Sequence, residues 1–267
     1  MTPFSQVRAL VTGGGGGIGT AIAEALLARG ASVLLVDRDP AALEAAATRF
    51  APLALRVGTF AGDLTRLDDR ARLVEQSAGW QGGINTLVNN AGVNHFGMFQ
   101  DQDPAQIELA LAINVHAPLH LCHAMLPQLS RQPFAHIVNM GSVFGSIGYP
   151  AYAVYSATKF ALRGFTEALR RELAGSTVHV HYLAPRATKT RINAAAVERM
   201  NAELGVAMDD PSVVGAALCR MLENDTAFAV VGWPEKLFAR INAVLPGAVD
   251  GALKKQLPII RRYATRA

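Results

Sequence analysis

The sequence is poor in charged residues, in cysteine and in long apolar runs. Charged residues make up 17% of its 267 residues, whereas hydrophobic residues make up 51%. That proportion provides ample material for a large buried core. The apolar residues are spread along the chain, and no run approaches the roughly 18 uninterrupted residues that a membrane-spanning helix requires. We therefore expect a globular core and no membrane span.

Cysteine is scarce, and the two that occur, Cys122 and Cys219, lie in apolar segments with helical character. Two such thiols indicate reduced core residues rather than a disulfide framework. The first ten residues contain Arg8 and no long apolar stretch, unlike a secretory signal. These features predict an intracellular, cytoplasmic protein.

Basic residues are few outside the C-terminal tail. The net charge is +4, but residues 235–267 alone carry seven basic and two acidic residues. The other 234 residues therefore sum to −1. Because the body lacks a basic face with interleaved aromatic residues, we expect no nucleic-acid partner.

Short β-branched apolar runs alternate along the chain with longer segments of helical periodicity. The predicted strands cover residues 7–12, 32–37, 55–61, 84–89, 136–140, 178–183 and 227–231. The predicted helices cover residues 18–29, 41–50, 67–78, 104–129, 152–173 and 211–223. This alternation predicts a doubly wound, parallel, seven-stranded Rossmann-type α/β sheet with helices on both faces. We expect a single domain, with a catalytic part over residues 1–232 and a helical extension over 233–267.

A glycine-rich segment, residues 12–19, follows the first predicted strand. Its glycines permit a tight turn and let backbone N–H groups approach a pyrophosphate, which the next helix N-terminus also favours. Two phosphate-binding patterns can be placed on it, G-x-G-x-x-G at Gly14, Gly16 and Gly19 and T-G-x-x-x-G-x-G from Thr12. By itself the segment also matches a plain strand–helix turn.

The second predicted strand ends at Asp37, eighteen residues beyond Gly19. A carboxylate there accepts hydrogen bonds from the adenosine ribose and repels a 2′-phosphate. Arg38 would pair with that phosphate if it turned inward, but no basic residue directly precedes Gly17. We therefore predict NAD(H), with NADP(H) as the alternative. Asp63, after the third strand, either contacts the adenine edge or caps the next helix.

Tyr155 and Lys159 lie four residues apart at the start of a predicted helix and so share one face. A free tyrosine titrates near 10, and a nearby ammonium favours the phenolate and lowers that pKa toward the working range. Ser142, after the fifth strand, is placed to hydrogen-bond a substrate oxygen. Tyr-x-x-x-Lys alone is common on helices, but after the glycine turn and Asp37 it points to general acid–base catalysis.

In this order the motifs resemble the short-chain dehydrogenase/reductase family from Val7 to about Gly232, about 85% of the chain. The matching elements are Thr12-Gly13-x-x-x-Gly17-x-Gly19, Asn89-Asn90-Ala91-Gly92, Asn114, Ser142 and Tyr155-x-x-x-Lys159. The resemblance implies that Tyr155 exchanges a proton with the substrate oxygen while Lys159 holds the nicotinamide ribose and tunes Tyr155. It also implies that Ser142 orients the carbonyl and that Asn114 holds a water of a proton relay through Lys159.

The same resemblance implies a set of cofactor contacts, with no metal required. They are Thr12, Gly13, Gly17, Ile18, Gly19, Asp37, Arg38, Asp63, Leu64, Asn90, Ala91, Gly92, Tyr155, Lys159, Pro185, Thr188 and Thr190. Residues that flank the motifs are the candidate substrate pocket: Val93, Asn94, His95, Val143, Phe144, Tyr149, Tyr152 and Arg186. Arg186 departs from the family, which usually has Pro-Gly here. It either binds a polar substrate group, closes the pocket or is a solvated loop arginine.

Three of the seven histidines, His116, His120 and His123, share helical spacing. No Asp or Glu accompanies them at ligand spacing, and Cys122 points elsewhere. We interpret them as helix-packing or interface residues and expect no metal site.

The chain continues past the seventh strand, where members of the family commonly finish. Apolar residues recur at helical spacing between Leu237 and Ile260, and Pro246 and Pro258 should break or kink the helix. With the tail's charge of +5, the stripe either lies on anionic lipid as a peripheral contact on the inner membrane face or packs over the substrate cleft or a sister subunit. Either arrangement favours a lipophilic substrate.

Three functions follow in order of preference. The first is an oxidoreductase that transfers a hydride between NAD(H) and a hydrophobic secondary alcohol or ketone, lipid-like or steroid-like. The second is an NADPH-dependent 3-oxoacyl reductase whose basic tail meets an acidic acyl carrier. The third is a non-catalytic dinucleotide-binding scaffold at a membrane surface. The resemblance also implies a homodimer or homotetramer.

Overall fold

The computed structural model describes residues 2–190 and 194–265, which contain a seven-stranded parallel sheet in the order β3-β2-β1-β4-β5-β6-β7. This confirms the predicted fold class. The strands are Arg8–Thr12 (β1), Ser32–Asp37 (β2), Val57–Ala61 (β3), Thr86–Asn89 (β4), Ala135–Met140 (β5), Val178–Ala184 (β6) and Phe228–Val230 (β7). The strand order reverses between β1 and β4. A ligand crevice is expected outside the carboxyl ends of the strands at such a switch point.

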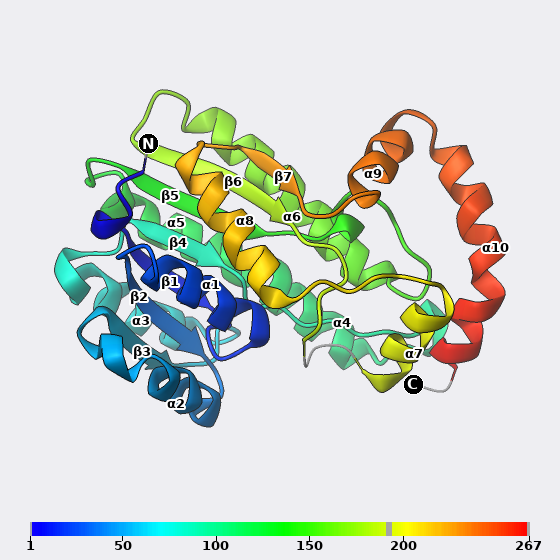
Figure 1. Ribbon diagram of the computed structural model, residues 1–267, viewed down its shortest axis with the longest axis horizontal. Coiled ribbons are helices and arrows are strands. Elements are labelled where there is room, and N and C mark those ends of the chain that lie inside the picture. The colour runs from blue at the N-terminus through cyan, green and yellow to red at the C-terminus, as the bar shows by residue number, and fades with distance from the viewer. Residues whose placement is uncertain (1, 191–193, 266–267) are drawn as a thin grey trace.

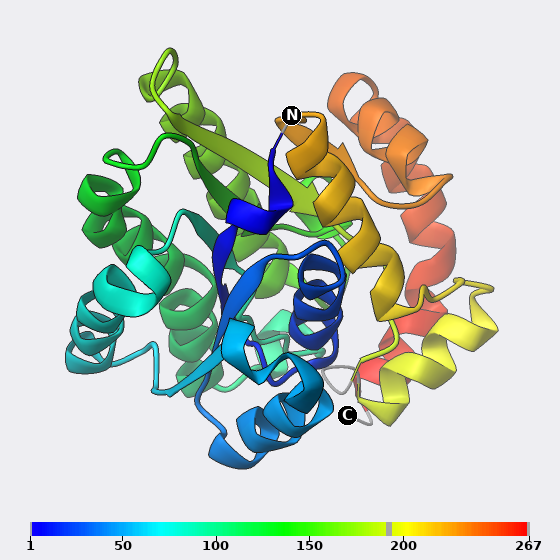
Figure 2. The same ribbon diagram turned by 60° about the vertical axis from the view of Figure 1, so that its left-hand side comes forward.

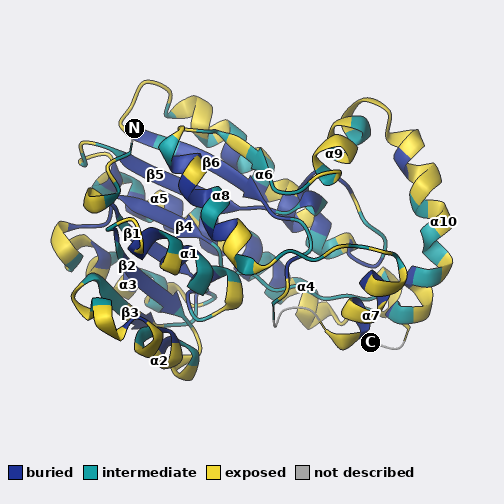
Figure 3. Cartoon of the chain, in the orientation of Figure 1, coloured by how far each residue is buried: buried dark blue, intermediate teal, exposed yellow. Residues whose placement is uncertain are grey.

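Helices cover both faces of the sheet (Figure 1). Three of them contribute to the core on one face: Gly17–Leu27 (α1), Pro40–Arg49 (α2) and Pro211–Glu223 (α8). Those on the other face are Leu67–Gly79 (α3), Pro104–Leu111 (α4), Ala117–Leu129 (α5) and Ala153–Glu172 (α6). The inner strands β1, β2, β4, β5 and β6 are almost entirely buried (Figure 3), whereas the edge strands β3 and β7 are largely accessible. Burial on both faces explains the uninterrupted apolar runs of the inner strands.

The predicted helix 104–129 is continuous in outline but changes geometry in the middle. A π-helical turn, Ala112–His116, separates α4 from α5 and contains the buried Asn114. Among the described residues, this segment alone is long and apolar enough to cross a bilayer. Its Leu121 and Met125 instead pack in the core beneath the sheet. We therefore interpret it as a core helix, and π turns of this kind are frequent at functional sites.

The C-terminal part of the chain lies beyond the carboxyl ends of the strands (Figures 1 and 2). It consists of Glu235–Val244 (α9) and Pro246–Ala264 (α10), beside a helix that the sequence analysis missed, Ala195–Glu203 (α7). Pro246 separates α9 from α10, as predicted. Proline interrupts a helix interior but is tolerated in a first turn, and Pro246 lies in the first turn of α10. Pro258 lies inside α10, which continues to Ala264, so Pro258 does not break the helix, and the alternative that it kinks the helix stays a prediction.

Candidate active site

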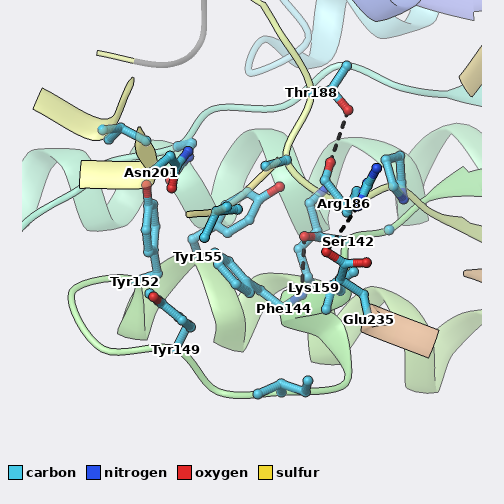
Figure 4. Close-up of a pocket in the computed structure, with 18 of the residues that line it drawn as sticks. Ser142, Phe144, Tyr149, Tyr152, Tyr155, Lys159, Arg186, Thr188, Asn201 and Glu235 are labelled. Carbon is cyan, nitrogen blue, oxygen red and sulfur yellow. Dashed lines mark hydrogen bonds and ion pairs between the residues drawn. The ribbon is translucent and has the colours of Figure 1, made fainter. Parts of the chain in front are cut away.

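A cavity of about 380 Å³ lies at the carboxyl edge of the sheet (Figure 4). One wall comes from the sheet side, with Ser142 directly after β5 and Tyr155 and Lys159 on the first turns of α6. The opposite wall comes from the helical cover, which we define as α7, α9 and α10. Its apolar contributions are Val197, Met200, Phe238, Val249 and Leu253. The predicted catalytic residues thus face a mostly apolar wall, to which the cover also contributes the polar side chains of Asn201, Glu235 and Gln256.

Burial dominates the acid–base properties of Tyr155 and Lys159. It raises the pKa of Tyr155 to about 12, although a hydrogen bond with Ser142 acts in the opposite direction. Burial also lowers the pKa of Lys159 to about 8. The Lys159 Nζ lies 5.6 Å from the centre of the Tyr155 ring and donates a 2.9 Å hydrogen bond to the Met140 carbonyl. The pKa of Tyr155 is therefore raised and not lowered as predicted, and a tyrosine with such a pKa keeps its phenolic proton at neutral pH.

Asn114 is buried in the π turn and holds the loop that follows β4. Its Nδ2 donates to the Val93 carbonyl at 2.9 Å and to the Thr158 Oγ1 at 3.1 Å, and its Oδ1 accepts from the Val93 N–H at 2.9 Å. No hydrogen bond joins Asn114 to Lys159 in the part of the chain that the structure describes. The geometry makes Asn114 a positioning residue that fixes the loop against α6, and its predicted water relay stays a prediction.

A groove of about 260 Å³ runs beside the glycine turn. Gly13 has a φ of +66°, and a side chain at Gly19 would overlap the Gly13 carbonyl, so both positions require glycine. Twelve of the predicted cofactor residues line this groove: Gly13, Gly17, Ile18, Gly19, Asp37, Arg38, Asp63, Leu64, Asn90, Ala91, Gly92 and Thr190. Four of them, Ile18, Asn90, Gly92 and Thr190, also line the cavity at Tyr155. The groove therefore leads directly to the predicted proton donor.

The remaining predicted cofactor residues divide into two groups. Pro185 and Thr188 line the cavity with Tyr155 and Lys159. Thr12 is buried, and its Oγ1 accepts hydrogen bonds from the Asn90 and Ala91 N–H groups at 2.9 Å each. Thr12 therefore acts through the loop after β4 and does not line either space.

Polar groups suited to a dinucleotide occur along the groove. The Asp37 Oδ2 accepts from the Gly15 N–H at 3.1 Å, which holds the carboxylate at the end of β2 beside the glycine turn. Arg38 is exposed. The buried Thr190 hydroxyl has no hydrogen-bond partner among the described residues, and the Thr190 side chain lies next to Gly17 through its methyl group. An unpaired hydroxyl at a helix N-terminus matches the phosphate contact that the sequence predicted.

Asp63 supports the local turn, whatever its contact with a ligand. Its Oδ1 accepts from the Thr65 N–H at 2.9 Å, and its own N–H donates to Asp69. The side chain thus caps the turn before α3 rather than α3 itself, whose N-terminal residue Arg66 makes no capping bond.

Six of the eight predicted substrate-pocket residues line the cavity: Asn94, Val143, Phe144, Tyr149, Tyr152 and Arg186. Val93 lines the cofactor groove instead, and His95 lies in a neighbouring groove. The aromatic members pack together, and the Phe144 ring is stacked on Tyr149 with ring centres 4.8 Å apart. The sequence analysis did not assign the lining residues of the cover, although the apolar stripe of the tail was the signal for them.

Arg186 is held in ion pairs at the edge of the cavity. Its guanidinium makes a two-pronged contact with Asp209, with Nε and Nη2 at 2.8 and 2.6 Å from the two carboxylate oxygens. Its Nη1 lies 3.5 Å from Glu235 at the start of α9. Arg186 holds the pKa of Asp209 below its usual value. These ion pairs join the segment after β6 to the start of α9, which agrees with the alternative that Arg186 closes the pocket, and its contact with a polar substrate group stays a prediction.

A second polar contact joins the cover to the sheet side. The Tyr149 hydroxyl donates to Gln256 Oε1 on α10 at 3.1 Å. Ile260 is fully buried in a cluster with Tyr152, Val197 and Met200. The inner face of the tail therefore packs over the cavity, one of the two arrangements that the apolar stripe predicted.

The model of the short chain dehydrogenase family matches residues 7–201. Among curated relatives, 2-(S)-hydroxypropyl-CoM dehydrogenase 3 of Xanthobacter autotrophicus is 34% identical over 66% of this chain and 69% of its own length. Ketoacyl reductase HetN of a Nostoc species is 27% identical over 94% of this chain and 89% of its own.

Solved structures resemble the whole chain. A short-chain dehydrogenase of Sphingobium yanoikuyae in complex with NADPH has a TM-score of 0.76 and 28% identity, covering 93% of this chain and 95% of its own. A short-chain dehydrogenase/reductase of Burkholderia phymatum in complex with NAD has a TM-score of 0.82 at 23% identity, covering 91% and 95%. At 23% identity, the likeness to the Burkholderia protein shows a shared fold and no more.

Proposed function

Because the chain belongs to the short-chain dehydrogenase family and is an oxidoreductase that acts on CH–OH groups, we propose that it interconverts an apolar secondary alcohol and its ketone with NAD(H). One observation carries the proposal. Tyr155 lines a cavity that shares Ile18, Asn90, Gly92 and Thr190 with the cofactor groove and whose far wall is mostly apolar.

In the reductive direction the reaction converts a ketone, NADH and a proton into a secondary alcohol and NAD⁺. A nicotinamide cofactor held in the groove would supply the hydride that the carbonyl carbon receives. Tyr155 then gives its phenolic proton to the carbonyl oxygen, and the high pKa of Tyr155 keeps that proton available at neutral pH. Ser142, which hydrogen-bonds Tyr155, orients the same oxygen. The oxidative direction reverses each transfer.

Lys159 and the groove residues have supporting roles in this proposal. The Lys159 ammonium would hold the ribose hydroxyls next to the nicotinamide, and the glycine turn with Thr190 would hold the pyrophosphate. Asp37 would accept hydrogen bonds from the adenosine ribose and oppose a 2′-phosphate, which is the reason to propose NAD(H) over NADP(H). The relatives and neighbours named above include proteins solved with each cofactor.

A 3-oxoacyl reductase is the second candidate, because the relative that matches 94% of this chain is named a ketoacyl reductase. It would use NADPH, and the basic residues of the tail would meet an acidic acyl carrier. The carboxylate of Asp37 and the apolar cover favour the first candidate. The scaffold function is the weakest, since Ser142, Tyr155 and Lys159 all line one cavity.

Three further expectations belong to this proposal. The buried, unpaired Cys122 and Cys219 suit a reducing cytoplasm. The family resemblance implies a homodimer or homotetramer. The outer side of the tail, with exposed Trp233, Val244 and Leu245 among basic residues, suits a peripheral contact with anionic lipid.

The test is a pair of single-hydroxyl deletions, Tyr155→Phe and Tyr152→Phe. Tyr152 lies beside Tyr155 in the same aromatic cluster, with ring centres 6.2 Å apart, so it is a matched control. On a panel of aliphatic and cyclic secondary alcohols with NAD⁺, we expect Tyr155→Phe to lower kcat by about 10²- to 10⁴-fold. Tyr152→Phe should change it less than tenfold. NADH binding, followed by nicotinamide fluorescence, should be unchanged in both, and turnover that survives Tyr155→Phe contradicts the mechanism.

A further inference from the structure

Three histidines and an aspartate gather on the amino-terminal side of β5, β6 and β7. This end of the strands lies opposite the cover (Figure 1). His136 lies on β5, His179 and His181 lie on β6, and Asp225 precedes β7. We call these four residues the histidine cluster. Because β5 and β6 pair in parallel, with His136 opposite His179, three rings from distant positions meet on one side of the sheet. His136 and His181 are buried, at 3% and 1% exposed.

The hydrogen bonds of the two buried rings fix where their protons are. The Thr2 hydroxyl must donate its proton to the Leu222 carbonyl, 2.7 Å away, because a carbonyl only accepts. The same hydroxyl therefore accepts from His136 Nε2–H at 3.1 Å. In the same way, His181 Nδ1–H donates to the Thr226 carbonyl at 2.9 Å.

A neutral imidazole has one N–H and one lone pair. The two remaining nitrogens, His136 Nδ1 and His181 Nε2, therefore both present lone pairs, and they face each other at 3.0 Å. Two acceptors at that distance repel unless a cation lies between or beside them. The cluster thus requires either an extra proton or a metal ion.

The position of Asp225 favours a metal ion over a shared proton. A shared proton would bond only the two ring nitrogens, because Asp225 Oδ1 lies 3.9 Å from His181 Nε2, too far for a hydrogen bond. A metal ion would engage all three groups, whose ligand atoms lie within 4.8 Å of one another. Zinc takes imidazole nitrogen and carboxylate oxygen at about 2.0–2.2 Å, so its tetrahedral ligands lie about 3.3–3.5 Å apart. The observed spacings bracket that value.

The surroundings of the cluster match those of metal-ligating side chains. Such histidines usually donate their outer N–H to a carbonyl or another oxygen, which fixes the tautomer. Thr2 and Thr226 serve His136 and His181 in this way. The other carboxylate oxygen of Asp225 accepts from His179 Nδ1 at 2.9 Å, and Asp225 is exposed, which gives an ion access from solvent.

We propose that His136, His181 and Asp225 bind one divalent transition-metal ion, with zinc as the best match. The ion joins β5, β6 and the segment before β7, and through Thr2 it also secures the first residues of the chain. The sequence analysis expected no metal, because it weighed only histidines that are close in sequence. The site lies at the edge of the sheet opposite Tyr155, so its role is structural and independent of hydride transfer.

The full-length protein, treated with a chelator and dialysed, is titrated with Co²⁺ and then with Zn²⁺. We expect one equivalent of Co²⁺ to give the visible absorption bands of a tetrahedral site and Zn²⁺ to displace it. Saturating zinc should raise Tm by about 5 °C, because an ion that binds only the folded state stabilises it. If the wild type binds no Co²⁺ above the background of a histidine-free protein, the proposal is overturned and the two rings share a proton.

Two variants separate this site from adventitious binding. Asp225→Asn removes the charged ligand and keeps the backbone, since asparagine tolerates the φ of 49° at this position. His120→Gln is the control, because exposed His116 and His120 are one helical turn apart and could chelate metal on the surface. Asp225→Asn should weaken Co²⁺ binding by about 10- to 100-fold without lowering the metal-free Tm, and His120→Gln should bind as the wild type does. Binding that survives Asp225→Asn and is lost in His120→Gln overturns the proposal.

Discussion

The two walls of the cavity are built in different ways. On the sheet side, Ser142 follows β5 and Lys159 lies on α6. A hydrogen bond from Lys159 to the Met140 carbonyl at the end of β5 holds the lysine in place. On the side of the cover, the contacts are mostly apolar, with Val249 and Leu253 on α10 and Phe238 on α9. Among the polar contacts that join the cover to the rest of the molecule are the ion pairs of Arg186 and the hydrogen bond from Tyr149 to Gln256.

From this difference we expect the sheet side to carry out the proton transfer and the cover to select the substrate. Proton transfer needs groups held within a few tenths of an ångström, which a sheet edge and a buried helix provide. Recognition of an apolar substrate needs only shape and buried area, which can vary without disturbing the reacting groups. Substitutions on the sheet side should therefore change kcat, and substitutions in the cover should change KM.

The largest expected effect is the response of the sheet side to pH. Burial lowers the pKa of Lys159 to about 8, so its ammonium is present below pH 8 and is lost above it. If the ammonium holds the cofactor ribose, reductive kcat/KM falls about tenfold per pH unit above 8, or about 100-fold by pH 10. Lys159→Arg, which stays charged, should give a flat profile at a lower rate. A wild-type profile that is flat to pH 10 contradicts this role of Lys159.

The second prediction concerns the cofactor groove on the sheet side, where Asp37→Ala tests whether Asp37 determines the preference for NADH over NADPH. Removing the carboxylate loses hydrogen bonds to the ribose and a charge that repels a 2′-phosphate. We expect the ratio of NADPH to NADH dissociation constants to fall by about 30-fold, with the sum of both effects near 2 kcal/mol. Fluorescence titration with each cofactor measures it. If the wild type prefers NADPH, Arg38 pairs with the 2′-phosphate of the adenosine ribose, and the 3-oxoacyl reductase becomes the better proposal.

A third prediction concerns the cover. Leu253→Gln places an amide against the apolar wall and should raise KM for a long-chain ketone about tenfold, with kcat nearly unchanged. Its control is Lys254→Gln on the exposed side of α10, which should alter neither constant. Steady-state kinetics on short and long ketones distinguishes them, since a short ketone should not respond to Leu253→Gln. An equal loss on both chain lengths would mean that Leu253 only stabilises the fold.

The smallest expected effect is binding of the outer side of the cover to lipid. Leu245 is 63% exposed and belongs to the basic tail, whereas Leu55 is 91% exposed and lies outside that tail. In co-sedimentation with vesicles containing phosphatidylserine, we expect a few-fold gain over neutral vesicles. Leu245→Asp should abolish the gain and Leu55→Asp should not. Equal sedimentation with both kinds of vesicle would exclude this contact.

The sequence predicted the sheet better than it predicted what lies around it. The order of strands and helices and the groove-lining residues from Gly13 to Gly92 were accessible because strand–helix alternation and turn glycines are local patterns. The third strand begins at Val57, two residues later than predicted, because residues 51–56 form a 3₁₀ helix. The π turn at Asn114 was not predicted, since nothing in the residue pattern distinguishes it from an α-helix.

The sequence by itself determined the parallel sheet, the placement of Asp37, Ser142, Tyr155 and Lys159 at its carboxyl edge, and the apolar stripe of the tail. Tertiary structure alone decided that the stripe covers the cavity, that Arg186 is paired with Asp209, and that His136 meets His181. Each of these depends on contacts between segments distant in the chain. Such contacts depend on how the elements pack in three dimensions. The periodicity of a segment predicts its secondary structure and its apolar face, but it does not predict which distant segment will pack against that face.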